Sequence, residues 1–216
     1  MQTSQNPPFG LFFEVTPHSG HLQHYFTHVE RLAAELAAQK GLLSLQRYNA
    51  QHASDKNDGE ALLSHQLWES EEAIAAWRAN KAHRTAQIAG MKTHFKDYRI
   101  RIGPRLWRWQ KDDAALPPVD QDKITTKMIL SLHCTTPLAL DTLPAAAHLD
   151  ITRFTSVQNA PSEIVLIGLT DYTKNHFTAI TEIMQACTNL PIDLSELFAI
   201  ERDYGKLDRT AAPDHG

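Results

Sequence analysis

The sequence predicts an α+β fold built from two consecutive units, each with the element order β-α-β-β-α-β. Short apolar runs alternate with segments whose apolar residues recur at helical spacing. The run at residues 62–102 reads as strand, helix and strand, and a weaker version of this layout follows at residues 163–201. Strand-like runs such as residues 62–68 and 163–169 are apolar on both faces, so we expect a second sheet to cover the face that carries no helices.

The first half begins with a β-rich run at residues 11–16 that ends at Pro17. Apolar residues then recur every three or four positions over residues 20–39, which predicts an amphipathic helix. Gly41 can take the left-handed conformation that stops a helix. A second strand is therefore expected at residues 42–49.

The rest of this unit follows from its capping and alternation signals. A third strand is expected at residues 60–68, after which Ser70 offers an N-cap and two glutamates favour the positive end of a helix dipole. A second short helix is expected at residues 81–89. The last strand is expected at residues 94–102, where side chains alternate between two faces.

The second half repeats this order in shortened form, which is the pattern that an internal duplication leaves. Only a short helix fits between residues 136 and 147, and a longer amphipathic helix is expected at residues 173–187. The expected strands are residues 127–134, 149–157, 163–170 and 193–201.

Between the halves, residues 104–126 carry prolines and charges without a sustained period, so they are expected to form a linker. Trp107 and Trp109 within it are expected to clamp the linker onto a domain by burying their rings. The predicted domains are therefore residues 9–103 and residues 127–205.

The composition limits the classes of partner. The chain has 216 residues, 42% hydrophobic content and a formal charge of −4, which suits a globular protein. It has no lysine and arginine stripe, so nucleic acid and anionic lipid are disfavoured. The apolar runs are too short to span a bilayer, and the N-terminus does not read as a signal peptide, which favours a cytoplasmic protein. Cys134 and Cys187 form no spaced motif and are expected to be buried thiols.

The strongest candidates for a site are Trp77 and His83. A helix that places an indole and an imidazole over the core face of a sheet would create an apolar cleft with one group that titrates near neutrality. The alternative is that Trp77 is plain core and His83 bonds a neighbouring turn. Tyr98 is expected on the same face, either as a hydrogen-bonding phenol or as a core tyrosine.

Three further residues complete the predicted site. Phe13 on the first strand would form a pocket wall, although its chemistry would be the same in a plain core. Trp68 is also placed where a pocket could be lined. Arg84 could bind an anionic oxygen through two parallel hydrogen bonds, although such an arginine is more often a surface ion-pair partner.

A histidine-rich segment near the first helix raises the question of a metal site. His21, His24 and His28 can share one side of the helix, and imidazoles bind Zn²⁺, Ni²⁺ or Cu²⁺. His21 and His28 lie two turns apart, roughly 10 Å, which is too far for both to bind one ion. A histidine pair with a ligand from elsewhere remains open, and the alternative is a set of exposed histidines on the polar face.

Several of these segments together resemble the antibiotic biosynthesis monooxygenase family of dimeric α/β barrels. The resemblance covers residues 11–102 and rests on FFEVTP, on Gly41-Leu42, on LWESEEAIAAW, on His83-Arg84 and on DYRIRI. It implies a ferredoxin-like fold in which two antiparallel sheets pack against each other. Here the two halves would pair within one chain as a tandem pseudo-dimer, or each half would pair with another chain in a homodimer.

The resemblance also implies a reaction. The family includes oxygenases of quinols and polyketides that use no cofactor, so we expect a monooxygenase that acts on a phenolic, quinol or polyketide-like aromatic molecule and O₂, without metal or flavin. His83 would take a proton from the substrate, Tyr98 and Arg84 would stabilise the resulting anion, and Trp77 would stack on the ring.

Two alternatives remain open from the sequence. The first is a barrel that binds a small apolar molecule without turning it over. The second is haem binding or degradation, which occurs in the family. The position of the iron-binding histidine in those relatives is Gln87 here, and Phe13 replaces an asparagine of their first strand, which favours a reaction without cofactor.

Overall fold

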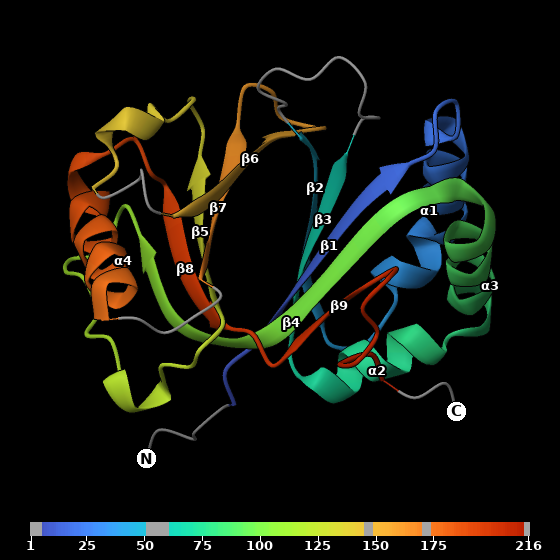
Figure 1. Cartoon of the computed structure of the whole chain (residues 1–216), viewed down its shortest axis with the longest axis horizontal. Helices are drawn as coiled ribbons and strands as arrows, with labels where there is room; N and C mark the ends of the chain where they lie inside the picture. Colours follow the sequence, from blue (N-terminus) through green and yellow to red (C-terminus); the bar gives the residue numbers. More distant parts are fainter. Residues whose placement is uncertain (1–5, 51–60, 145–148, 170–173, 214–216) are drawn as a thin grey trace. The chain divides into compact units, whose positions relative to one another are not determined.

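The computed structural model describes residues 6–50, 61–144, 149–169 and 174–213. The chain divides into two compact units (Figure 1). Unit 1 consists of residues 1–47, 52–103 and 202–216, and unit 2 consists of residues 48–51 and 104–201. No helix among the described residues has the length and apolar character needed to cross a membrane.

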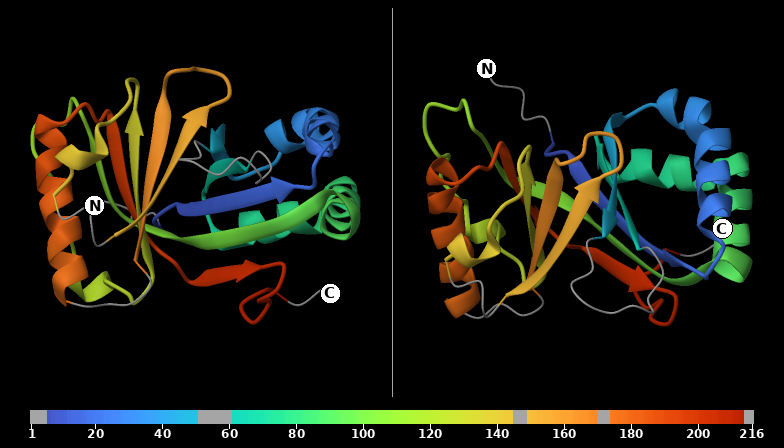
Figure 2. Two further views of the ribbon diagram at one scale, coloured as in Figure 1. Left: turned by 45° about the horizontal axis from the view of Figure 1, so that its top comes forward. Right: turned by 90° about the horizontal axis from the view of Figure 1, so that it is seen from above.

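Unit 1 is an antiparallel sheet with helices on one face, as Figure 2 shows. Its strands follow the order β2-β3-β1-β4-β9, and β1 pairs with β3 in a register that matches Phe9 with Trp68. A buried cluster that includes Leu36, Trp68 and Trp77 lies between helices and sheet. The elements are β1 (Phe9–Pro17), α1 (Leu22–Ala37), β2 (Leu42–Ala50), β3 (Leu62–Trp68), α2 (Glu71–Ala79), α3 (Lys81–Ala89), β4 (Phe95–Gln110) and β9 (Arg202–Gly205), with a π-helical turn at Gly90–His94.

Local signals in the sequence predict the helix boundaries around α1, α2 and α3. The Ser70 hydroxyl accepts a hydrogen bond from the Ala73 amide at 3.3 Å, so the predicted N-cap of α2 is confirmed. Gly41 has a φ of +84°, which confirms the predicted left-handed residue between α1 and β2. Asn80 ends α2 and caps α3, because its side chain accepts hydrogen bonds from the amides of Ala82 and His83.

Replacing Gly41 with alanine should destabilise unit 1 for two separate reasons. The positive φ strains any residue with a Cβ, and a Cβ at this position would lie 2.6 Å from the Ala73 Cβ. Gly20 provides a matched control, because its φ is +77° and its Cβ would meet nothing within 4 Å. We expect Gly41→Ala to lower the free energy of unfolding by about 1–3 kcal/mol more than Gly20→Ala in urea denaturation. Equal losses for the two variants would contradict the steric argument.

The described residues of unit 2 have the same strand order, with one helix, α4, and a short 3₁₀ turn in place of a first helix. Its strands run β6-β7-β5-β8, followed by the end of β4, and this matches the order β2-β3-β1-β4 of unit 1. The last residues of β2, Tyr48–Ala50, pair with β6. The predicted α+β class with ferredoxin-like sheets is confirmed, whereas the internal duplication stays a prediction. The elements are β5 (Met128–Cys134), a 3₁₀ turn (Leu140–Thr142), β6 (Asp150–Ser156), β7 (Glu163–Leu169), α4 (Lys174–Ala186) and β8 (Leu194–Ala199).

The predicted linker is wrong at its beginning. Residues 105–110 are the second half of β4 and pair with β8, with a register shift between Arg105 and Trp107. Trp107 and Trp109 are buried in the core of unit 2, and Arg108 between them is exposed. This alternation is typical of a strand, but the prolines and charges of residues 104–126 as a whole favour a linker.

The end of the chain also differs from the prediction. Residues 202–205 were assigned to the second domain, but they form β9, which pairs with residues 99–102 of β4 and belongs to unit 1. A strand of four residues carries too little periodicity to be recognised from sequence. Its assignment depends on pairing with a segment about a hundred positions away.

Candidate functional site

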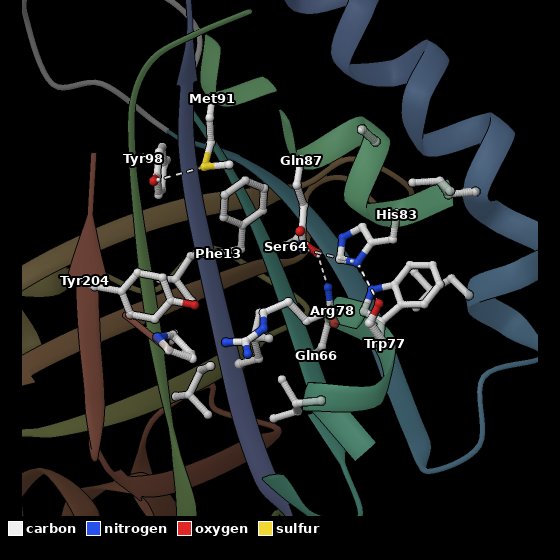
Figure 3. Close-up of a pocket in the computed structure, with 18 of the residues that line it drawn as sticks. Phe13, Ser64, Gln66, Trp77, Arg78, His83, Gln87, Met91, Tyr98 and Tyr204 are labelled. Carbon is white, nitrogen blue, oxygen red and sulfur yellow. Dashed lines mark hydrogen bonds between the residues drawn. The ribbon is translucent and has the colours of Figure 1, made fainter. Parts of the chain in front are cut away.

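Unit 1 contains a cavity of about 400 Å³ with a mainly apolar lining. It lies between the helix-covered face of the sheet and the three helices, and Figure 3 shows residues from both sides. Phe13, Trp77, His83 and Tyr98 all line it, so the structure brings together four of the six predicted site residues. A volume of this size falls within the range of small-molecule sites in proteins.

Trp77 and His83 form one wall of the cavity. Trp77 is the third-last residue of α2, Asn80 turns the chain into α3, and His83 lies in the first turn of that helix. The two rings stack with centroids 4.3 Å apart and planes 13° from parallel. This helix junction therefore supplies the apolar surface and the imidazole that the sequence predicted.

The hydrogen bonding of His83 fixes the position of its proton. Its Nδ1 lies 3.0 Å from the backbone carbonyl oxygen of Trp77. Because a carbonyl can only accept, Nδ1 carries the hydrogen and Nε2 keeps a lone pair in the neutral ring. Burial lowers the pKa of His83 below its ordinary value, and the bond to Trp77 raises it only in part. His83 is therefore neutral at pH 7 and suited to accept a proton.

Tyr98 lies on the opposite side of the cavity from His83 in Figure 3. Its hydroxyl accepts a hydrogen bond from Arg209 Nη1 at 2.6 Å and donates one to the Met91 sulfur at 3.4 Å. Phe13 contributes wall surface beside Phe95, with ring centroids 6.0 Å apart. The phenol is thus held in place and polarised by a guanidinium.

Residues 8–89 match the family model described as antibiotic biosynthesis monooxygenase. These residues include β1, β2 and β3 and the three helices around the cavity. Residues 8–89 are an antibiotic biosynthesis monooxygenase domain. The match ends before β4 and β9, which complete the sheet of unit 1.

Known proteins resemble this chain to different extents. A jasmonate monooxygenase of Pyricularia oryzae is 30% identical over 95 residues, which are 44% of this chain and 42% of the relative, so the chain spans less than half of that protein. Among solved structures, an aldoxime dehydratase has a TM-score of 0.52 at 8% identity, over 93% of this chain and 83% of that chain. This likeness concerns the fold alone. An anthrone oxidase-like protein has a TM-score of 0.37 at 13% identity, over 98% of both chains.

Two of the predicted site residues do not line the cavity of unit 1. Trp68 is fully buried in the core, where its indole N–H donates to Gln66 Oε1 at 3.0 Å, and Gln66 in turn lines the cavity. Arg84 lies on the exposed side of α3. Both positions were close to the site in sequence, but the direction of each side chain depends on packing that sequence spacing does not specify.

The cavity also contains residues that sequence reasoning missed. Arg47, Arg78, Tyr204 and Arg209 line it, and the last two come from the end of the chain, beyond the monooxygenase domain. Gln87 lines it as well, with its amide nitrogen 3.3 Å from His83 Nδ1. This contact is longer than the 3.0 Å to the Trp77 carbonyl, which decides the tautomer of His83. The sequence around an arginine does not show whether its side chain lines a cavity. Only the folded chain shows this.

The histidines at the N-cap and in the first turns of α1 gather around His94. His21 Nδ1 lies 3.0 Å from His94 Nδ1, and the ring of His24 stacks on that of His94 with centroids 4.8 Å apart. His28 and His94 also line the cavity of unit 1. Among the residues that the structure describes, no group of three or more histidine, cysteine or acidic side chains is arranged to hold a metal ion.

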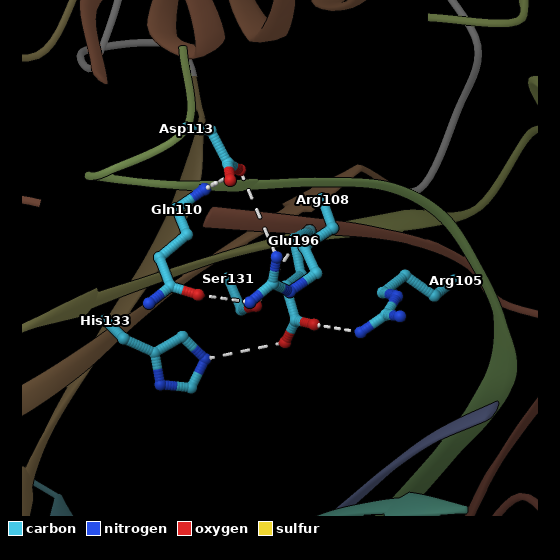
Figure 4. A network of polar contacts seen from close by, with 7 residues as sticks. All are labelled: Arg105, Arg108, Gln110, Asp113, Ser131, His133 and Glu196. Carbon is cyan, nitrogen blue, oxygen red and sulfur yellow. Dashed lines mark hydrogen bonds and ion pairs between the residues drawn. The ribbon is translucent and has the colours of Figure 1, made fainter. Parts of the chain in front are cut away.

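Unit 2 carries a separate polar network around Glu196, shown in Figure 4. Arg105 Nη1 donates to one carboxylate oxygen at 2.6 Å, and His133 Nε2 lies 3.9 Å from the other. The Tyr48 hydroxyl lies 3.5 Å from His133 Nδ1. Burial lowers the pKa of His133, and the nearby Glu196 carboxylate raises it in part. The imidazole is therefore buried in its neutral form.

This neutral His133 should make stability depend on pH. The unfolded chain binds a proton at His133 below about pH 6.5, whereas the folded chain binds it only at lower pH, so stability falls as the pH is lowered from 6.5. We expect His133→Asn to reduce the slope of unfolding free energy against pH between pH 6.5 and 5 by at most about 1.4 kcal/mol per pH unit. Urea denaturation across this range checks it, with exposed His18→Gln as control. An unaltered slope in His133→Asn would contradict the prediction.

Proposed function

We propose that unit 1 is a monooxygenase that uses neither metal nor flavin. Its substrate would be a small, mainly apolar molecule with an acidic phenolic or enolic O–H. The observation that carries the proposal is His83, a neutral imidazole whose Nδ1–H is bound to the Trp77 carbonyl and whose ring stacks on Trp77 at the cavity wall. The monooxygenase domain of residues 8–89 supports the same reaction class.

The proposed reaction begins with proton transfer to His83 Nε2. The resulting anion gives one electron to O₂, and the substrate radical combines with superoxide to form a carbon–oxygen bond. The hydroperoxide then loses water: His83 returns its proton to the departing oxygen, and a second hydrogen leaves the substrate carbon. One oxygen atom of O₂ remains in the product as a carbonyl, and the other leaves in water. The substrate itself supplies all electrons.

The role of the cavity is to hold the ring and protect the radical pair. The indole of Trp77 and the ring of Phe13 offer flat apolar surface, which favours an aromatic or alicyclic body. The apolar lining also excludes water from the anion, so its electron is easier to transfer to O₂. The name of the relative in Pyricularia oryzae adds jasmonate to the compounds that merit testing.

Oxygen uptake with labelled O₂ tests this proposal. The purified chain is mixed with 1-naphthol, or with anthrone, whose enol form is a phenol, and consumption of O₂ is recorded. With ¹⁸O₂, mass spectrometry should show one labelled oxygen in each molecule of product. Binding of these compounds without O₂ uptake above the buffer rate would reject the oxygenase and favour a protein that only binds its ligand.

A further inference from the structure

The end of the chain brings a group of cations and phenols to the cavity. Tyr204 on β9 and Arg209 beyond it belong to unit 1 and line the cavity, as do Arg78 of α2 and Tyr98 of β4. Arg78 is hydrogen bonded to Tyr204, and Arg209 donates to the Tyr98 hydroxyl. Figure 3 shows Arg78 between Tyr204 and Trp77. We call Arg78, Tyr98, Tyr204 and Arg209 the cationic group.

The formal charges of the lining favour an anion. Four arginines and two glutamates line the cavity, so its charge is positive when histidines are neutral. Arg202 forms an ion pair with Glu71, so a carboxylate of the protein already neutralises its charge. Among the described residues, Arg78 has no carboxylate within ion-pair distance. Its hydrogen-bond partner is a neutral phenol.

The Arg78 side chain is partly buried, so its guanidinium keeps only part of its hydration. A cation moved out of water loses solvation, and a hydroxyl dipole returns only part of that loss. Burial raises the pKa of Tyr204, while the neighbouring arginines lower it in part, so its hydroxyl keeps a proton that it can donate. Both guanidiniums and the phenolic O–H line the cavity as hydrogen-bond donors, which is the chemistry that binds a carboxylate.

We propose that the cavity binds an organic carboxylate, with the carboxylate at Arg78, Arg209 and Tyr204 and the apolar body directed toward Trp77 and His83. This assignment rests on the proposed function, because it makes the cavity the substrate site. It narrows the substrate class from any apolar phenol or enol to one that also carries an acid group.

Matched pairs of an acid and its methyl ester test the charge preference directly. Calorimetry under anaerobic conditions measures binding of jasmonate and methyl jasmonate, and of 2-naphthoate and methyl 2-naphthoate. We expect at least one acid to bind about tenfold or more tightly than its ester, and Arg78→Met to weaken that acid about 10- to 100-fold while changing the ester little. Arg84→Met is the matched control, since this arginine does not line the cavity.

A conservative variant shows whether weaker binding in Arg78→Met comes from the lost charge or from a general folding defect. Arg78→Lys keeps the positive charge, so it should retain part of the preference for the acid, whereas Arg78→Met should lose it. The proposal is overturned if neither acid binds more tightly than its ester, or if Arg78→Met keeps the wild-type preference. Binding is measured without O₂, so a charge preference without turnover would reject the oxygenase alone, and turnover without a preference would reject the anion site alone.

Discussion

Replacing His83 with alanine should lower kcat for any substrate that the chain oxidises by about 10²- to 10⁴-fold. The residual rate would come from binding the substrate next to O₂ in an apolar cavity. His83→Ala also removes the ring that stacks on Trp77, so KM is expected to rise modestly. Initial rates of O₂ consumption, measured over a range of substrate concentrations, separate the two effects.

The pH profile distinguishes a proton acceptor from a packing residue. A general base acts only in its neutral form, so wild-type turnover should rise with pH as His83 loses its proton and should level off above that point. Burial places this step below the ordinary imidazole pKa of about 6.5. The His83→Ala variant should show neither this rise of turnover with pH nor the wild-type rate. The control is Arg84→Ala on the exposed side of α3, and a His83→Ala variant with wild-type turnover would exclude the mechanism.

Most of the fold could be predicted because its signals are local. The helix stop at Gly41 and the cap at Ser70 each involve residues within a few positions, and both are confirmed. The second half of β4 was missed because Gly103-Pro104 is typical of a loop, although the strand continues through these residues. The pairing of this part of β4 with β8 has a register shift between Arg105 and Trp107, and such an irregularity depends on the partner strand.

The candidate site also has one part that local sequence signals predict and one part that they do not. Trp77 and His83 come together through one helix junction that Asn80 caps, so their proximity follows from a short stretch of sequence. Tyr204 and Arg209 reach the cavity only because β9 pairs with β4 across about a hundred positions. Capping and spacing rules act over a few residues and therefore cannot predict this second half of the site.

At Trp68 the structure contradicts the role that the sequence predicts, and this difference can be tested. It was predicted to line a pocket, but its side chain is fully buried in the core of unit 1. We expect Trp68→Ala to lower the free energy of unfolding by about 3–5 kcal/mol, because it leaves a large cavity beneath the sheet. Urea denaturation, followed by circular dichroism, measures this loss.

A second substitution separates stability from ligand contact. Trp68→Phe keeps most of the apolar volume but removes the N–H that donates to Gln66 Oε1, so it should cost about 1–3 kcal/mol. Its affinity for a cavity ligand should stay within about twofold of wild type, since the indole does not line the cavity. Trp77→Phe is the comparison, because this indole does line it and its loss should weaken ligand binding. If Trp68→Phe weakened binding and left stability unchanged, the predicted role as a pocket wall would be correct and the core assignment wrong.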